Sequence, residues 1–228
     1  MTVSELARQA GEAYRSGDLE STINLWERAH AVALDAGDVV AAADAAVHVA
    51  LHLMMDTGFM APVRGWTRRA ERLLEGQDVG RVHAWIAVVD AYERLLSGDP
   101  ASARDTAARA IAIGSASGDH AAVAVARLAE GRSLIVGGDI AEGLPLLDEA
   151  GVAVLSGELD ALTAGVIYCE LICAYQSLAL HDRADEWTTA MERWRATDAV
   201  GSFGGRCRVH RAEILRLRGE TADAESEA

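Results

Sequence analysis

Aromatic residues and prolines are scarce in this chain, and both shortages limit the folds that it can adopt. Phe, Trp and Tyr make up 5% of the 228 residues although 50% are hydrophobic, so Ala, Leu and Val must form most of the core. Only 3 prolines occur, and the 21 glycines fall mostly at regular intervals. This composition fits helices separated by short turns, because proline disrupts helix interiors and glycine ends helices. We therefore expect an all-α fold.

Positive charge is also in short supply. Lys and Arg total 21 against 35 Asp and Glu, which gives a formal net charge of −14. A surface this acidic repels phosphate backbones, so we expect no direct binding to nucleic acid. No run reaches the roughly 18 apolar residues of a membrane helix, and the N-terminus lacks the basic start and apolar core of a signal peptide. No membrane association is expected.

Cysteine is too rare to indicate a disulfide framework. The three cysteines cannot all be paired, and Cys169 and Cys173 lie four residues apart on one predicted helix. Thiols at that spacing usually stay free, and we expect these two to be small core residues. Free thiols are typical of a reducing compartment, so a cytoplasmic location is expected.

The chain is rich in a repeated Gly-Asp pair. The pair stands at residues 17–18, 37–38, 98–99, 118–119 and 138–139, with related turn sequences between and after these positions. Glycine permits the left-handed turn that ends a helix, and the following aspartate can cap the next helix. A spacing of about 20 residues predicts one helix and one turn each time. We expect helices at 3–15, 20–36, 39–56, 61–75, 79–96, 100–116, 120–136, 140–155, 159–179, 183–196, 203–217 and from 221 onward.

Small residues recur at matching positions of successive helix pairs. One column stands twelve residues after the turn glycines, at spacings of 41, 40 and 40, and consists of Ala29, Ala70, Ala110 and Ala150. A second column, seven residues before the turns, consists of Ala10, Leu51, Ala91, Gly131, Ala174 and Ala212. Small residues there let neighbouring helices approach closely. The pattern predicts one solenoid domain of about 40-residue repeats over residues 1–228, with an incomplete C-terminal repeat.

These columns resemble tetratricopeptide repeats, in which a small residue precedes the turn and alanines follow it. Trp26 stands at the second-helix aromatic position of the first repeat, and Thr67, Ala107 and Leu147 replace it in later repeats. The longer, Ala-rich unit is similar to the repeat segments of large bacterial LuxR-type (MalT-like) transcription regulators. The resemblance implies a right-handed α-solenoid that serves as a non-enzymatic binding or sensor module. The sequence has no Gly-rich phosphate loop and no basic recognition helix.

The resemblance also implies which residues line the concave surface, because the first helix of each repeat faces inward in that family. Carried over onto this chain, the register turns a set of rarer side chains toward the groove. They are His48, His52, Met55, Trp85, Tyr92, Arg132, Tyr168 and Tyr175. Such a set predicts a partly apolar pocket that binds a peptide, a partner protein or a small molecule. The alternative is a rotated register, in which these side chains pack between repeats.

One predicted helix carries a stripe of acidic and histidine side chains spaced four residues apart, which places them on the same face. The stripe consists of Asp44, His48, His52 and Asp56. Two histidines at this spacing can share a metal ion, and an aspartate beside a histidine can orient it as a general base. The chain has no HExxH and no G-x-S-x-G motif. We therefore expect no enzyme activity, cofactor or metal. The stripe is expected to contact a ligand or to face solvent. The alternative is a metal- or His-dependent enzyme that uses these four residues.

The last predicted helix is short. Only TADAESEA follows Gly219-Glu220, and a helix of that length is not stable alone. Because solenoids normally end in a polar cap, we expect either that this chain is a fragment of a longer protein or that this edge meets another molecule, as in a homodimer.

Overall fold

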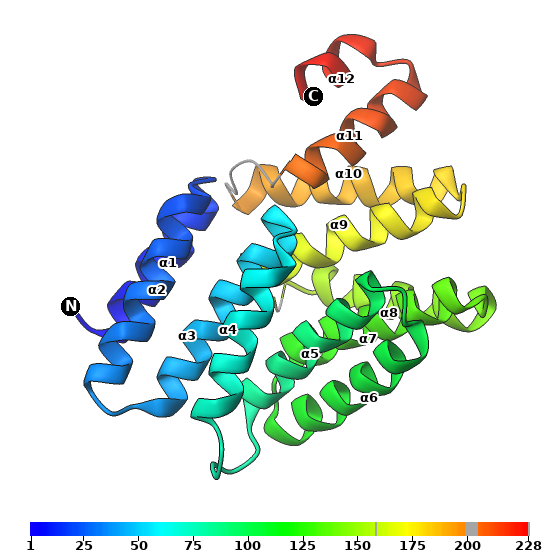
Figure 1. The fold of residues 1–228 in the computed structure, drawn as a ribbon. Helices are drawn as coiled ribbons and strands as arrows, with labels where there is room; N and C mark the ends of the chain where they lie inside the picture. The colour runs from blue at the N-terminus through cyan, green and yellow to red at the C-terminus, as the bar shows by residue number, and fades with distance from the viewer. Residues whose placement is uncertain (158, 199–204, 228) are drawn as a thin grey trace.

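The protein is an array of consecutive α-helices (Figure 1). The computed structural model describes residues 1–157, 159–198 and 205–227, and the regular structure in these ranges is helical. The elements are α1 (Val3–Arg15), α2 (Leu19–Asp35), α3 (Val39–His52), the π-helical turn η1 (Leu53–Thr57), α4 (Met60–Leu73), α5 (Arg81–Leu96), α6 (Pro100–Ser117), α7 (His120–Gly137), α8 (Ile140–Leu155), α9 (Ala161–Ser177), α10 (His181–Asp198), α11 (Gly205–Arg218) and α12 (Thr221–Glu227). With α3 and η1 counted as one helix, these bounds lie within two residues of the predicted ones, and the predicted α-solenoid of consecutive helix pairs is confirmed.

The helices form two layers. Each helix packs against the next one along the chain, and α3, α5, α7 and α9 also contact one another in that order. The odd-numbered helices therefore make the inner, concave layer, as expected for helix pairs of this kind. In addition, α1 contacts α9, although seven α-helices separate them in the sequence. This contact brings the start of the array against α9 and closes part of the concave face.

The Gly-Asp turns have the predicted geometry. Gly17, Gly98 and Gly118 have φ angles of 82°, 83° and 70°, in the left-handed region that glycine tolerates. The carboxylate of Asp18 then accepts a hydrogen bond from the backbone N–H of Ser21 at 3.0 Å, and Asp38, Asp99 and Asp119 repeat this contact. Asp139 begins α8 without such a hydrogen bond. Four of the five Gly-Asp turns thus end one helix and cap the next.

Ala179 breaks this rule, and the exception gives a testable prediction. It has a φ of 55°, which makes it the non-glycine residue with positive φ in the described chain. A left-handed conformation costs an L-residue about 1–2 kcal/mol, and the greater freedom of glycine in the unfolded chain offsets part of the gain. We expect Ala179→Gly to raise the free energy of unfolding by about 0.5 kcal/mol, as measured by urea denaturation. Gly98→Ala should lower the free energy of unfolding, because it places alanine in the same left-handed conformation. A loss of stability in Ala179→Gly would show that Ala179 is not strained.

The column of alanines on the second helices is buried as predicted. Ala29, Ala70, Ala110 and Ala150 are at most 1% exposed. Glycines allow a still closer approach between α7 and α8. A Cβ atom on Gly131 would lie 2.5 Å from Leu147 Cδ1 and 2.9 Å from the carbonyl oxygen of Gly143. Side chains at this crossing are therefore excluded by the facing backbone.

The π-helical turn at the end of α3 shifts the register of that helix. A π-helical turn holds one residue more than an α-helical turn, and η1 accounts for the alanine spacing of 41 where the next spacings are 40. Because of this extra residue, the position of α3 that matches the inner-helix column of small residues is Ala50 and not Leu51. Ala50 is fully buried. Leu51 instead lines two cavities on the inner face.

The segment Val39–Thr57 corrects the expectation that no stretch is long enough for a membrane helix. By length and composition it could cross a membrane, with a mean hydropathy of 1.4. More than half of it is buried inside the solenoid, where α2, α4 and α5 pack against it. Its apolar character is that of a core helix.

The expectation for the cysteines is wrong in part. Cys169 takes part in a disulfide, whose partner lies outside the described side chains. Cys173 keeps its thiol and lies beside Arg132. Spacing along one helix shows only that two cysteines are unsuited to pair with each other, and it does not exclude a bond to another helix. The argument from free thiols to a compartment therefore no longer holds.

Candidate functional site

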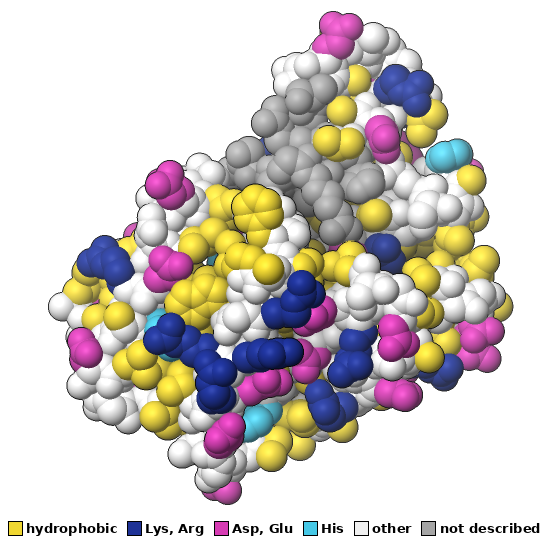
Figure 2. All heavy atoms as spheres, in the orientation of Figure 1, with side chains coloured by type: hydrophobic (Ala, Val, Ile, Leu, Met, Phe, Trp, Pro, Cys, Tyr) yellow, Lys and Arg dark blue, Asp and Glu magenta, His cyan; other side chains and the backbone are white. Residues whose placement is uncertain are grey.

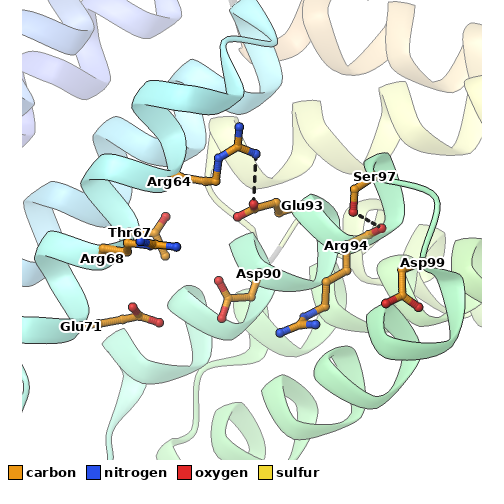
Figure 3. Close-up of a pocket in the computed structure, with 9 residues that line it drawn as sticks. All are labelled: Arg64, Thr67, Arg68, Glu71, Asp90, Glu93, Arg94, Ser97 and Asp99. Carbon is orange, nitrogen blue, oxygen red and sulfur yellow. Dashed lines mark hydrogen bonds and ion pairs between the residues drawn. The ribbon is translucent and has the colours of Figure 1, made fainter.

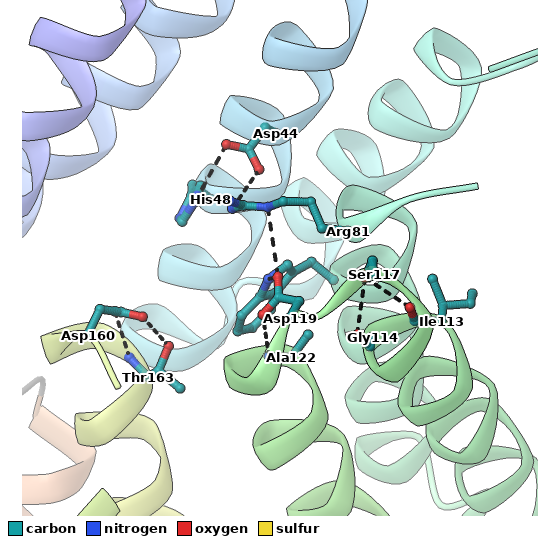
Figure 4. Close-up of polar contacts among 11 residues, drawn as sticks. Asp44, His48, Arg81, Ile113, Gly114, Ser117, Asp119, Ala122, Asp160 and Thr163 are labelled. Carbon is teal, nitrogen blue, oxygen red and sulfur yellow. Dashed lines mark hydrogen bonds and ion pairs between the residues drawn. The ribbon is translucent and has the colours of Figure 1, made fainter. Parts of the chain in front are cut away.

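An inner cavity lies where the N-terminal ends of α5, α7 and α9 face the middle of α3 (Figure 4). Its volume is about 510 Å³. The lining residues are His48, Leu51, Arg81, Trp85, Ser117, Gly118, Asp119, His120, Ala121, Asp160, Leu162 and Thr163. We call this space the mouth cavity.

Arg81 and Asp119 organise the polar wall of the mouth cavity. The Arg81 guanidinium lies between two carboxylates, 3.4 Å from Asp44 and 3.8 Å from Asp119 (Figure 4). Asp119 caps α7 by accepting from the Ala122 N–H at 2.9 Å, and its second oxygen accepts from the Trp85 indole N–H, also at 2.9 Å. One carboxylate thus begins a helix, fixes an aromatic side chain and holds a cation at the entrance.

His48 lies at the back of the mouth cavity, stacked on Trp26. The ring centroids are 4.0 Å apart with an interplanar angle of 4°, and Nε2 lies 4.0 Å from an oxygen of Asp44. Burial lowers the pKa of His48, and the nearby Asp44 carboxylate offsets only part of that effect. Nδ1 is buried and has no hydrogen-bond partner among the described residues. The neutral imidazole therefore keeps one hydrogen-bonding position unused.

His52 is more deeply placed than His48. It is 2% exposed, its Nδ1 lies 3.4 Å from Asp56, and its ring centroid lies 5.0 Å from that of Tyr14. Burial raises the pKa of Tyr14, and Asp56 and Asp160 act in the same direction. The sequence stripe thus forms two separate Asp–His pairs. In the described part of the chain, no group of three or more His, Cys, Asp or Glu side chains is placed to hold a metal ion.

Two smaller cavities lie next to the mouth cavity. One of about 120 Å³ is lined by α1, α2, α3 and the start of α9, and includes Tyr14, Trp26, His48 and His52. The other, of about 10 Å³, is enclosed mainly by apolar side chains and includes Met55, Trp85 and Tyr92. The structure therefore brings five of the eight sequence-predicted site residues to one connected region of the inner face.

The other three predicted residues lie elsewhere. Arg132 donates to Glu170 at 2.7 Å in a buried ion pair between α7 and α9. Tyr168 packs against Trp187 and Trp194 of α10, and the Tyr175 hydroxyl donates to Asp148 of α8 at 2.5 Å. Both tyrosines are fully buried because α9 is covered on several sides, so the carried-over register does not identify a groove face there.

Sequence reasoning missed Arg81, Asp119, Asp160 and Leu162. Asp119 was interpreted only as a helix cap, Asp160 was assigned no role, and the first turns of α5 and α9 are not inward positions in the carried-over register. The Gly-Asp turn that contains Asp119 was visible in the sequence. The convergence of these four residues depends on the curvature that brings α9 against α1, which no local pattern records.

A second cavity, of about 400 Å³, lies outside the inner face between α4 and α5 (Figure 3). Its walls are charged: Arg64 and Arg68 come from α4, and Asp90, Glu93 and Arg94 from α5. Figure 2 shows basic and acidic side chains gathered over this part of the surface. Arg64 pairs with Glu93 across it at 3.2 Å. The charged side chains of this cavity are thus partly neutralised by each other, and its walls provide few apolar contacts for a ligand.

Asp90 in this second cavity gives a pH-dependent prediction. Burial, together with the nearby Glu71, raises its pKa from 3.8 to about 6, although Arg109 lies 3.7 Å away. The Asp90 carboxyl therefore binds its proton more tightly in the folded state than in the unfolded state. Protonated Asp90 contributes its full stabilisation below pH 3.8, and this contribution is lost as the pH rises through about 6 and the carboxyl ionises. We expect Asp90→Asn to raise the free energy of unfolding by about 1–2 kcal/mol at neutral pH.

The measurement is urea denaturation of wild type and Asp90→Asn across the acidic to neutral range. The two proteins should converge in acid and separate as Asp90 ionises. The exposed Asp105→Asn is the matched control and should stay within about 0.5 kcal/mol of wild type. A constant difference between wild type and Asp90→Asn at all pH values would contradict the assignment.

Comparisons with known proteins add a likeness of fold. No family model matches this chain, and no curated protein sequence matches it. Among solved structures it is similar to a crystal structure of nearly identical TPR-like repeats from a Podosopora anserina protein described as a kinesin light chain. That similarity has a TM-score of 0.41 and 15% sequence identity, over 86% of this chain and 95% of the other. The assignment of helix pairs rests on the packing of this chain's own helices.

Proposed function

We propose that this chain is a non-enzymatic binding module that takes a small organic molecule into the mouth cavity. The observation that carries the proposal is the closure of the concave face, where the start of α9 contacts α1 and lines, together with α3, a cavity of about 510 Å³. Cavities of roughly 300–1,000 Å³ are the usual size for small ligands. An extended peptide or a partner protein, the other predicted occupants, would need an open channel along the inner helices.

The lining of the mouth cavity suits such a ligand. Trp85 provides a flat apolar surface whose orientation is fixed by Asp119. The exposed guanidinium of Arg81 is available for polar recognition. A few fixed polar groups beside an apolar wall are typical of sites that select one small molecule.

The regulatory setting is part of the same proposal. The repeat columns resemble those of LuxR-type bacterial regulators, so we propose that the module senses its ligand on behalf of a transcription regulator in the cytoplasm. The net charge of −14 makes the chain itself unsuited to DNA, so another domain or protein would have to make that contact. Ligand binding between α3 and α9 would change the curvature of the array and so transmit the signal.

A thermal-shift screen of neutral and charged metabolites against the wild-type chain tests the proposal. For a compound that stabilises the protein, we expect Arg81→Ala to weaken binding at least tenfold by calorimetry. Arg64→Ala is the matched control, since Arg64 is similarly exposed and pairs with a carboxylate at the other cavity. Loss of binding in Arg64→Ala instead would place the site between α4 and α5. Failure of every metabolite, together with binding of extended peptides, would favour the groove-binding alternative.

Self-association through the C-terminal edge stays a prediction. On α11, Val209 and Leu217 are 55% and 53% exposed, which leaves apolar surface for a second copy of the chain. We expect light scattering to show a mass that rises toward that of a dimer with concentration, and Leu217→Glu to abolish the rise. A monomer at every concentration would contradict this prediction.

A further inference from the structure

One residue, Leu162 in the first turn of α9, lines each of the three inner-face cavities described above. It lines the mouth cavity, the cavity of about 120 Å³ near Tyr14 and Trp26, and the apolar space of about 10 Å³ near Trp85 and Tyr92. The other described lining residues border at most two of these spaces. The three spaces therefore meet at the position that Leu162 occupies.

We propose that Leu162 controls access to a deeper ligand chamber, of which the mouth cavity is only the entrance. The inference rests on the proposed function and adds the chemical class of the ligand. With Leu162 in place, the innermost space is about the size of a single water probe and apolar. When the side chain moves aside, the three spaces become one chamber lined by aromatic side chains from α1, α2 and α5. Such a chamber fits a neutral, aromatic molecule that places its apolar body inside and its polar end at the mouth.

A helix cap fixes the backbone at Leu162. Asp160 accepts hydrogen bonds from the N–H groups of Leu162 and Thr163 at 3.0 and 3.1 Å, and from the Thr163 hydroxyl at 2.6 Å. Thr163 is buried, whereas Leu162 is only partly buried and adjoins empty space on three sides. The backbone of this turn is thus fixed, while the Leu162 side chain has room to change rotamer. A ligand can displace it without breaking the cap.

Titration with N-phenyl-1-naphthylamine, a neutral aromatic probe whose fluorescence rises in apolar surroundings, tests the proposal. We expect Leu162→Ala to bind the probe at least tenfold more tightly than wild type, because truncation joins the three cavities. Leu162→Phe should bind at least fivefold more weakly than wild type, because a larger side chain fills the junction. Leu178→Ala is the matched control: Leu178 is also partly buried, at the other end of α9, and lines none of the three cavities.

Near-UV circular dichroism identifies any variant that has lost its packing, and the Leu162→Phe comparison decides the question if Leu162→Ala does not fold. Equal affinities in wild type, Leu162→Phe and Leu178→Ala would overturn the proposal, as would a gain in Leu178→Ala equal to that in Leu162→Ala. Absence of saturable probe binding in both wild type and Leu162→Ala would also overturn it. The proposed function is tested separately, because the Arg81→Ala comparison concerns the mouth cavity and does not involve this probe.

Discussion

Gly131→Val is expected to lower the free energy of unfolding by about 3 kcal/mol, which overpacking of a tight interface typically costs. The first added carbon would already lie 2.9 Å from the carbonyl oxygen of Gly143 and 2.5 Å from Leu147 Cδ1. The leucine side chain can turn away, but the backbone of α8 cannot move without separating the two helices. Urea denaturation followed by circular dichroism measures the effect.

Gly65→Ala is the control for Gly131→Val. Gly65 lies inside α4, and a Cβ atom there would meet nothing within 4 Å. Alanine is the better helix former, so this substitution should raise stability by about 0.5–1 kcal/mol. If Gly131→Val were as well tolerated as Gly65→Ala, the close approach of α7 and α8 would be wrong.

The second large effect is expected for Arg132→Met, with a loss of about 3–5 kcal/mol in the free energy of unfolding. Arg132 and Glu170 are 15% and 3% exposed and lie 2.7 Å apart, so the pair ties α7 to α9 inside the array. Methionine keeps much of the apolar stem but removes the guanidinium that lies 2.7 Å from the buried Glu170 carboxylate. Loss of this charge partner inside the array, rather than loss of packing, accounts for most of the expected effect.

Two further variants separate the charge effect from a packing effect. Arg127→Met removes an arginine of α7 that pairs with Glu149 of α8 on the surface, where both partners are more than a third exposed. It should cost less than about 1 kcal/mol. The double variant Arg132→Met with Glu170→Leu should recover at least half of the loss, because an apolar pair can replace a buried ion pair. If the double variant were no more stable than Arg132→Met, packing would be the cause.

The local signals in the sequence were sufficient for most of the fold. Glycine followed by aspartate determines where a helix ends and the next one begins, because the two residues satisfy the backbone at both helix ends. The alanine columns predicted where paired helices approach closely, because only small residues fit at the contact between two such helices. The register of α3 was the exception: the alanine spacing of 41 contains one extra residue, but the spacing does not show that this residue lies in a π-helical turn before Gly58.

The site was predictable only where it depends on one helix at a time. His48, His52 and Met55 come from α3 and η1, and Trp85 and Tyr92 from α5; their inward orientation follows from helix periodicity. Tyr168 and Tyr175 were misplaced because α9 is apolar on nearly every side, so periodicity does not distinguish its faces. Leu162 and Arg81 depend on how far the array curves, which is a property of all the repeats together.

The contact between α1 and α9 has a consequence for how the chain folds. Tyr14 and Asp160 line the same cavity although seven α-helices lie between α1 and α9 in the sequence. Open helical arrays assemble from neighbouring pairs and fold quickly, because their contacts are local. Here one contact spans most of the chain and carries a large loop-closure entropy, so it should form last, after the separate helix pairs have already assembled.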